Sequence, residues 1–89
     1  MYKLLITKKA TKFIKLLPTS KRKIIKQKFN LLIQNPYPNQ SLDIKKMKGY
    51  SDIYRLRIGK YRFIYELKEK ELIILVMTVG FRGNVYKRF

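Results

Sequence analysis

The chain has 89 residues, enough for one domain with a single modest core and too few for two. It contains no cysteine and no histidine, which excludes disulfides and thiolate or imidazole metal sites, and we expect neither a metal ion nor another cofactor. Twenty-two Lys and Arg residues against five Asp and Glu give a formal net charge of +17. Such an excess predicts an anionic partner: nucleic acid, an acidic protein, or both.

The location of the protein is predicted from two further features. No apolar run is long enough to span a bilayer, and the N-terminus places its apolar patch before its lysines, the reverse of a secretory signal. We therefore expect a soluble cytoplasmic protein without membrane association, folded as one domain over residues 1–89.

Two amphipathic helices are predicted after a short strand at residues 2–7. The first helix has apolar residues at the i, i+3, i+4 and i+7 spacing of one face: Ala10, Phe13, Ile14 and Leu17. Pro18 ends this helix, and Thr19 or Ser20 is expected to cap the second. The second helix carries one apolar stripe: Ile25, Phe29, Leu32 and Ile33. It ends at the proline-rich loop 35–40, so the pair is interpreted as a helical hairpin.

The second half of the chain has the period of strands. Residues 53–58 and 61–66 alternate between apolar and polar, which predicts two half-exposed strands. Residues 72–79 are continuously apolar, which favours a central strand covered on both faces, and the KEKE segment 68–71 is a polar turn before it. The chain is therefore predicted to be an α+β domain of order β-α-α-β-β-β. Its N-terminal strand and helical hairpin would pack on one face of a small, curved, mainly antiparallel sheet.

Gly59 and Lys60 separate the two alternating runs and predict a two-residue hairpin with a type II′ turn. This turn sets a register in which Arg57 faces Arg62, and side chains then alternate between the two faces of the sheet. One face receives six apolar or aromatic residues and is expected to meet the helices: Tyr54, Leu56, Ile58, Tyr61, Phe63 and Tyr65. The other face receives Arg55, Arg57 and Arg62.

Arginines that face each other across two strands repel, at a cost of some tenths of a kcal/mol to about 1 kcal/mol when exposed. Convergent guanidinium groups are typical of a phosphate site, which is the hypothesis we favour. The alternative is that Glu66 or a carbonyl group relieves the crowding and that the arginines are ordinary surface charge.

Other residues are candidates to extend this basic surface. Four lysines are predicted to bind RNA, three from the loop that enters the hairpin and one from its turn: Lys45, Lys46, Lys48 and Lys60. Arg82 and Tyr86 follow the last strand, where they would reach the same rim of the sheet, although Tyr86 could equally pin the C-terminal segment to the core. Tyr37 and Tyr50 could stack on bases or simply pack their loops.

The sequence resembles the RelE/ParE family of toxins from toxin–antitoxin pairs over nearly its whole length. The similarity is carried by five segments: ATKFIKLLP (10–18), NPYP (35–38), DIKKMKGY (43–50), YRLRIGKYRFIYEL (54–67) and VGFRGNVY (79–86). The resemblance implies a compact basic fold with two N-terminal helices behind a curved antiparallel sheet.

Within this family, RelE-like members cleave messenger RNA in the ribosomal A site, whereas ParE-like members poison DNA gyrase without cutting RNA. The resemblance implies that Arg62 and Arg82 hold the scissile phosphate and that Tyr86 orients the nucleotide, with Arg55 and Arg57 completing the catalytic set. The reaction implied is attack of a ribose 2′-OH on the adjacent phosphate, without a metal. Arg57 departs from a family lysine and Phe81 from a frequent polar residue, so the proton-transfer group stays open between Tyr86, a lysine such as Lys48, and water.

Three functions follow as hypotheses. The leading one is a ribosome-dependent mRNA endonuclease, the second is a gyrase inhibitor of the ParE type, and the third is a non-toxic basic RNA-binding protein of the ribosome. As a toxin, the chain is expected to bind an acidic, partly flexible antitoxin and to meet operator DNA only through that complex.

Overall fold

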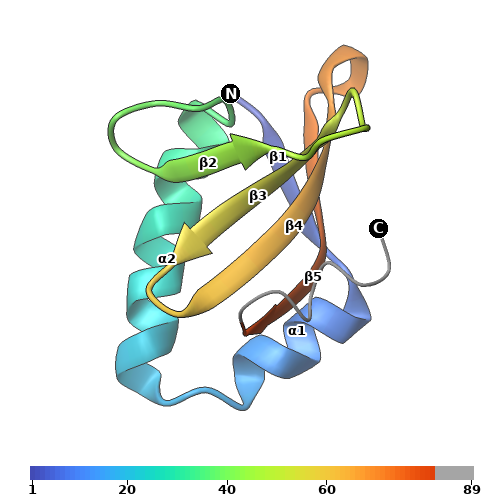
Figure 1. The fold of residues 1–89 in the computed structure, drawn as a ribbon. Helices are drawn as coiled ribbons and strands as arrows, with labels where there is room; N and C mark the ends of the chain where they lie inside the picture. The colour runs from blue at the N-terminus through green and yellow to red at the C-terminus, as the bar shows by residue number, and fades with distance from the viewer. Residues whose placement is uncertain (82–89) are drawn as a thin grey trace.

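The computed structural model describes residues 1–81, which form an α+β domain with one five-stranded sheet and two helices (Figure 1). In chain order the elements are β1 Lys3–Ile6, α1 Lys8–Lys15, α2 Thr19–Gln34, β2 Asp43–Lys46, β3 Ile53–Ile58, β4 Tyr61–Lys68, a 3₁₀ turn Glu69–Glu71 and β5 Ile73–Phe81. The predicted fold class is confirmed. Strand β2 is an addition, because residues 43–46 were expected to be loop.

The strands lie in the order β1-β5-β4-β3-β2, and only the β1–β5 pair is parallel within residues 1–81. The predicted hairpin register is confirmed, since Arg57 pairs with Arg62 and Leu56 with Phe63. Gly59 has a φ of 59° while Lys60 does not have a positive φ, which is the combination that a type II′ turn requires.

The core lies between the helices and one face of this sheet. All six hairpin residues predicted for that face are buried, and Leu56, Phe63 and Tyr65 are wholly inaccessible. The ring of Phe29 on α2 meets the ring of Phe63 edge to face, with centroids 5.3 Å apart. Neither helix of the described residues combines the length and the apolar character needed to cross a membrane.

The starts of the two helices differ from each other. Thr7 caps α1, because its hydroxyl accepts a hydrogen bond from the Ala10 N–H at 3.2 Å and donates one to the Met77 carbonyl at 2.7 Å. The predicted side-chain cap of α2 is wrong: Thr19 is already helical, Pro18 occupies the N-cap position, and no side chain caps the helix. The proline favours this start because its fixed φ suits a helix entrance.

The prediction that the last strand is covered on both faces is corrected. The helix side of β5 is buried at Ile74, Val76 and Val79, but the residues between them are only half-buried. Burial on both faces occurs instead in β4, but only around Ile64, which is inaccessible on the side away from the helices. The reason is topological, since β4 is the middle strand and the short β1 is the outer neighbour of β5.

Candidate nucleic-acid interface

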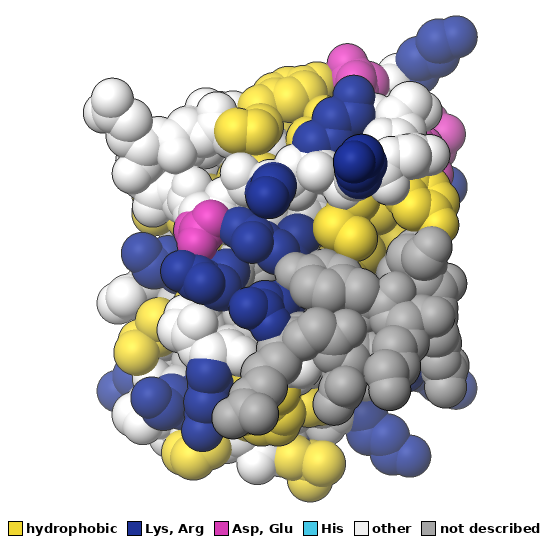
Figure 2. Space-filling model, in the orientation of Figure 1, with side chains coloured by type: hydrophobic (Ala, Val, Ile, Leu, Met, Phe, Trp, Pro, Cys, Tyr) yellow, Lys and Arg dark blue, Asp and Glu magenta, His cyan; other side chains and the backbone are white. Residues whose placement is uncertain are grey.

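The three hairpin arginines lie on the sheet face that is turned away from the helices. Arg57 stands between two partners in register, Asp43 on β2 and Arg62 on β4, while Arg55 is opposite Lys45. Figure 2 shows Lys and Arg side chains gathered over the β2–β3–β4 part of this face, with acidic atoms at their border. The new strand β2 therefore brings one carboxylate and one more cation beside the hairpin.

Asp43 bridges two of the arginines. Arg55 Nη2 donates a hydrogen bond to Asp43 Oδ1, and it lies 3.4 Å from the carbonyl oxygen of the same residue. Arg57 Nε lies 3.0 Å from the other carboxylate oxygen, Oδ2. The counter-charge thus comes mainly from Asp43 and not from Glu66, which is paired with Ile53 further along the sheet.

The two bridged arginines occupy different environments. The Arg55 side chain is 15% exposed, and its Nε is buried without a hydrogen-bond partner in the described part of the chain. The Arg57 side chain is 50% exposed. Because buried donors are nearly always satisfied, such an Nε–H is uncommon in a folded protein.

A depression of about 410 Å³ collects most of the predicted cations. It is lined by Lys45, Lys46, Met47, Lys48, Arg55 and Arg62. Arg57 is not among these residues and lines a neighbouring depression instead, together with Asp43 and Lys28. We call the first depression the arginine–lysine pocket. Its five cations can bind an anion and stabilise negative charge that develops on it.

Lys60 is placed elsewhere. Its Nζ lies 5.4 Å from the ring centroid of Phe81 and 5.8 Å from that of Tyr61, whose ring belongs to the helix side of the sheet. The hairpin turn therefore carries Lys60 away from the arginine–lysine pocket. The remaining predicted site residues, Arg82 and Tyr86, lie outside the described residues.

The tyrosines divide between packing and surface roles. Tyr65 donates a hydrogen bond of 2.6 Å to the Pro36 carbonyl, and burial raises the pKa of its phenol. Tyr54 stacks on Tyr65 with ring centroids 5.6 Å apart, and Tyr37 meets Tyr54 edge to face. Tyr37 thus packs the proline-rich loop onto the sheet, whereas Tyr50 is 37% exposed.

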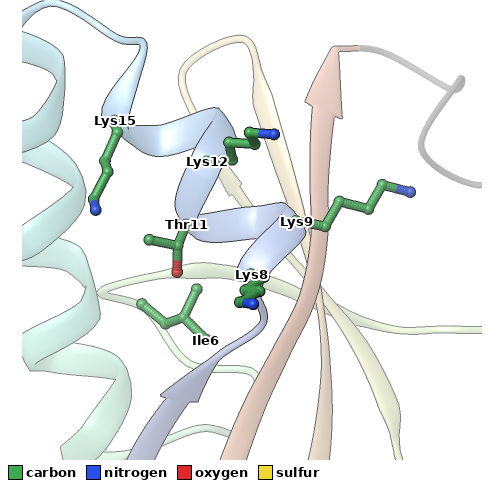
Figure 3. Close-up of a pocket in the computed structure, with 6 residues that line it drawn as sticks. All are labelled: Ile6, Lys8, Lys9, Thr11, Lys12 and Lys15. Carbon is green, nitrogen blue, oxygen red and sulfur yellow. The ribbon is translucent and has the colours of Figure 1, made fainter.

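A second basic depression of about 710 Å³ lies along α1. It is lined by Ile6, Lys8, Lys9, Thr11, Lys12 and Lys15. Figure 3 shows that its lysine side chains spread in different directions. This arrangement differs from the arginine–lysine pocket, where guanidinium groups are held on neighbouring strands, and it is typical of a solvated helix surface.

Asp43 is the site residue that sequence reasoning missed. If residues 43–46 form a strand, alternation places Asp43 and Lys45 on one face, but four residues are too few for the sequence to show that period. Among residues 1–81, no three acidic side chains are grouped so that they could hold a metal ion.

Comparisons with known proteins show which proteins this chain is similar to. The sequence model of one family, described as "ParE toxin of type II toxin-antitoxin system, parDE", matches residues 4–86. A Methanocaldococcus jannaschii protein named RelE1 is 38% identical over 82 residues, which cover 92% of this chain and 91% of that protein.

Two solved structures are similar to this chain in both fold and sequence. The archaeal RelE–RelB complex from Pyrococcus horikoshii gives a TM-score of 0.82 at 29% identity, covering 93% of this chain and 97% of that one. The RelB–RelE antitoxin–toxin complex from Methanococcus jannaschii gives a TM-score of 0.73 at 34% identity, covering 96% and 98%.

Proposed function

Because this chain belongs to the RelE/ParE family of toxins from type II toxin–antitoxin systems, we propose that it is a metal-independent mRNA endonuclease that acts on the ribosome. The observation that carries the proposal is the arginine–lysine pocket, in which Arg55 and Arg62 line one depression together with three lysines. A phosphodiester is the anion that best fits two guanidinium groups flanked by further cations.

The proposed reaction begins with attack of a ribose 2′ oxygen on the adjacent phosphorus. The bond from phosphorus to the 5′ oxygen breaks, the 2′ proton is lost, and the leaving 5′ oxygen gains a proton. The products are a 2′,3′-cyclic phosphate and a 5′-OH. Negative charge rises on the phosphoryl oxygens in the transition state, and preorganised guanidinium groups stabilise that charge without a metal.

The remaining residues have proposed roles at different distances from the reacting phosphate. Arg62 and Arg55 bind it, joined by Arg82 and with Tyr86 orienting the nucleotide, as the family resemblance implies. Three lysines bind the neighbouring RNA backbone: Lys45, Lys46 and Lys48. Arg57 contributes at the border of the site, and Lys60 acts only as a distant cation near the hairpin turn.

We further propose an acidic antitoxin as the protein partner. Two observations support it: the charge of +17, and the two similar structures, which are complexes of RelE with RelB. Contact with operator DNA would then occur through the antitoxin, and the site of action would be the cytoplasm.

Inhibition of DNA gyrase is the second candidate, because the family model that matches this chain is described by the ParE name. It predicts that mRNA stays intact and that cleavage complexes of gyrase accumulate. The arginine–lysine pocket has no evident use in that function.

The test is incubation of purified protein with programmed ribosomes, followed by mapping of mRNA ends by primer extension, beside a gyrase supercoiling assay. We expect ribosome-dependent cleavage that Arg62→Ala lowers by about 10²–10³-fold. Lys70→Ala is the matched control, because it also removes one positive charge but from the exposed 3₁₀ turn. Intact mRNA together with trapped gyrase would replace the proposal by the second candidate. Intact mRNA with active gyrase and unimpaired growth would favour a non-toxic RNA-binding protein.

A further inference from the structure

One carboxylate stands inside the basic face of the sheet. Of the five acidic residues of the chain, four line a depression at another part of the surface: Asp52, Glu66, Glu69 and Glu71. Asp43 is the fifth, and it forms both ion pairs found within residues 1–81. A negative charge beside a phosphate site lowers the affinity for anions. A favourable effect of the Asp43 carboxylate is therefore expected to offset this loss.

The register explains how one aspartate reaches two arginines. Arg57 is directly opposite Asp43, whereas Arg55 is opposite Lys45 and reaches Asp43 diagonally. Diagonal neighbours on one face are within reach of long side chains. Without Asp43, Arg55 would stand against the like charge of Lys45, and Arg57 against that of Arg62.

The two ion pairs have different consequences for the arginines. Arg55 uses a terminal nitrogen, Nη2, for Asp43 and still lines the arginine–lysine pocket. Arg57 is engaged through Nε, at the root of its guanidinium group, and lies in the neighbouring depression. The same carboxylate therefore lies on the border between the two depressions, with one arginine on each side.

We propose that Asp43 is a positioning residue, whose carboxylate fixes Arg55 inside the phosphate-binding pocket and retains Arg57 outside it. The inference rests on the proposed endonuclease function and deepens it. It assigns the phosphate to Arg55 and Arg62. The rate of cleavage then depends on how the cations are arranged as well as on how many there are. Asp43 lowers RNA affinity by its charge and raises the rate by orientation.

This pair of opposite effects gives a signature that a merely structural residue would not produce. For Asp43→Asn we expect tighter binding of an uncleavable 2′-deoxy oligonucleotide, by about twofold to fivefold at low salt, because a nearby negative charge is removed. In single-turnover cleavage on ribosomes we expect a rate about tenfold lower, because Arg55 is no longer oriented. Asp43→Glu, which restores the charge, should recover part of the rate.

Glu71→Gln is the matched control, since it removes one negative charge at the exposed 3₁₀ turn. It should leave the cleavage rate unchanged and affect oligonucleotide binding less than Asp43→Asn does. The proposal is overturned if Asp43→Asn cleaves within about twofold of the unaltered protein. It is equally overturned if the slower rate merely follows weaker binding of the oligonucleotide.

A second measurement separates this inference from the proposed function. Inorganic phosphate is titrated into the unaltered protein while the Nε–H signals of the arginines are followed by NMR. We expect Arg55 and Arg62 to shift at lower phosphate concentration than Arg57. If the protein does not cleave mRNA but shows this order, the endonuclease proposal fails, while the assignment of the phosphate to Arg55 and Arg62 and not to Arg57 stands. If Arg57 shifts together with Arg55, the positioning role fails whatever the enzyme does, and this holds even where Asp43→Asn does not fold.

Discussion

The two faces of the β3–β4 hairpin are formed by alternate residues of the same two strands but are organised by different forces. On the helix side, Leu56 and Phe63 are inaccessible and pack against apolar neighbours from both helices and from β5. On the other side, Arg57 and Arg62 oppose each other, and Asp43 on β2 forms ion pairs with both Arg55 and Arg57.

The difference shows how a strained arrangement of charge can persist. Burial of a large apolar side chain contributes about 1.5–3 kcal/mol, whereas repulsion between exposed opposed charges costs no more than about 1 kcal/mol. The apolar face therefore fixes the register, and the register in turn places Arg57 opposite Arg62. The hydrophobic face makes the basic face rigid.

Phe63 and Arg62 are neighbours on β4 whose side chains point to opposite faces, so truncating each of them separates the roles of the two faces. Phe63→Ala should lower the free energy of unfolding by about 3–5 kcal/mol, because it leaves a cavity against Phe29. Chemical denaturation of this variant and of Arg62→Ala measures the difference. Arg62→Ala should change the unfolding free energy far less. Equal destabilisation by the two variants would show that the basic face also holds the fold together.

The second prediction reverses the roles of the same two positions. Arg62→Ala should reduce ribosome-dependent mRNA cleavage by about 10²–10³-fold, the usual effect of removing one preorganised donor from a developing negative charge. Single-turnover cleavage rates provide the measurement, with Lys70→Ala as the variant of equal charge. A rate for Arg62→Ala within a few-fold of the unaltered protein would remove Arg62 from the phosphate site.

Most of the fold could be predicted from the sequence, because the alternation of apolar and polar residues is clear in the segments that are most buried. The alternation in 53–66 gave both the hairpin register and the identity of the buried face, and Gly59 gave the turn. Strand β2 could not be found in this way. It has four residues with only Ile44 buried, which is too short for a period to show.

The candidate site was less predictable than the fold, because it depends on contacts between strands that are separated in the sequence. Which face the arginines occupy follows from local alternation, but their partner Asp43 comes from a strand twelve residues away from Arg55. The separation of Arg57 from the arginine–lysine pocket and the departure of Lys60 toward Phe81 depend on side-chain contacts between strands. Local sequence carries little information on such contacts.

A third prediction concerns the hydrogen bond that Tyr65 makes from the buried face of the sheet. Tyr65→Phe removes the hydrogen bond to the Pro36 carbonyl and should cost about 1–2 kcal/mol of unfolding free energy at pH 8. Burial raises the pKa of Tyr65 in the fold, so its stabilisation is complete below the ordinary pKa of about 10. It is lost as the pH rises beyond that value, because the unfolded chain ionises first.

The corresponding measurement is the unfolding free energy of both proteins between pH 8 and pH 11. The unaltered protein should lose stability more steeply above pH 10 than Tyr65→Phe, so the difference between them should narrow. Burial also raises the pKa of Tyr54, which adds the same trend to both proteins and leaves the difference to Tyr65. A constant difference across this range would mean that Tyr65 does not titrate differently in the folded and unfolded states.

The smallest expected effect comes from the turn that joins the two faces. Gly59 has a φ of 59°, and a Cβ built there meets no atom within 4 Å, so Gly59→Ala introduces backbone strain without a clash. The cost should be about 1 kcal/mol. Lys60→Ala, at the adjacent turn position without a positive φ, is the control and should cost less.

Because the apolar pairs fix the register, mRNA cleavage by Gly59→Ala should stay near the original rate at temperatures where the protein is folded. A large loss of cleavage in a folded Gly59→Ala protein would mean that the turn, and not the apolar face, holds the arginines in place.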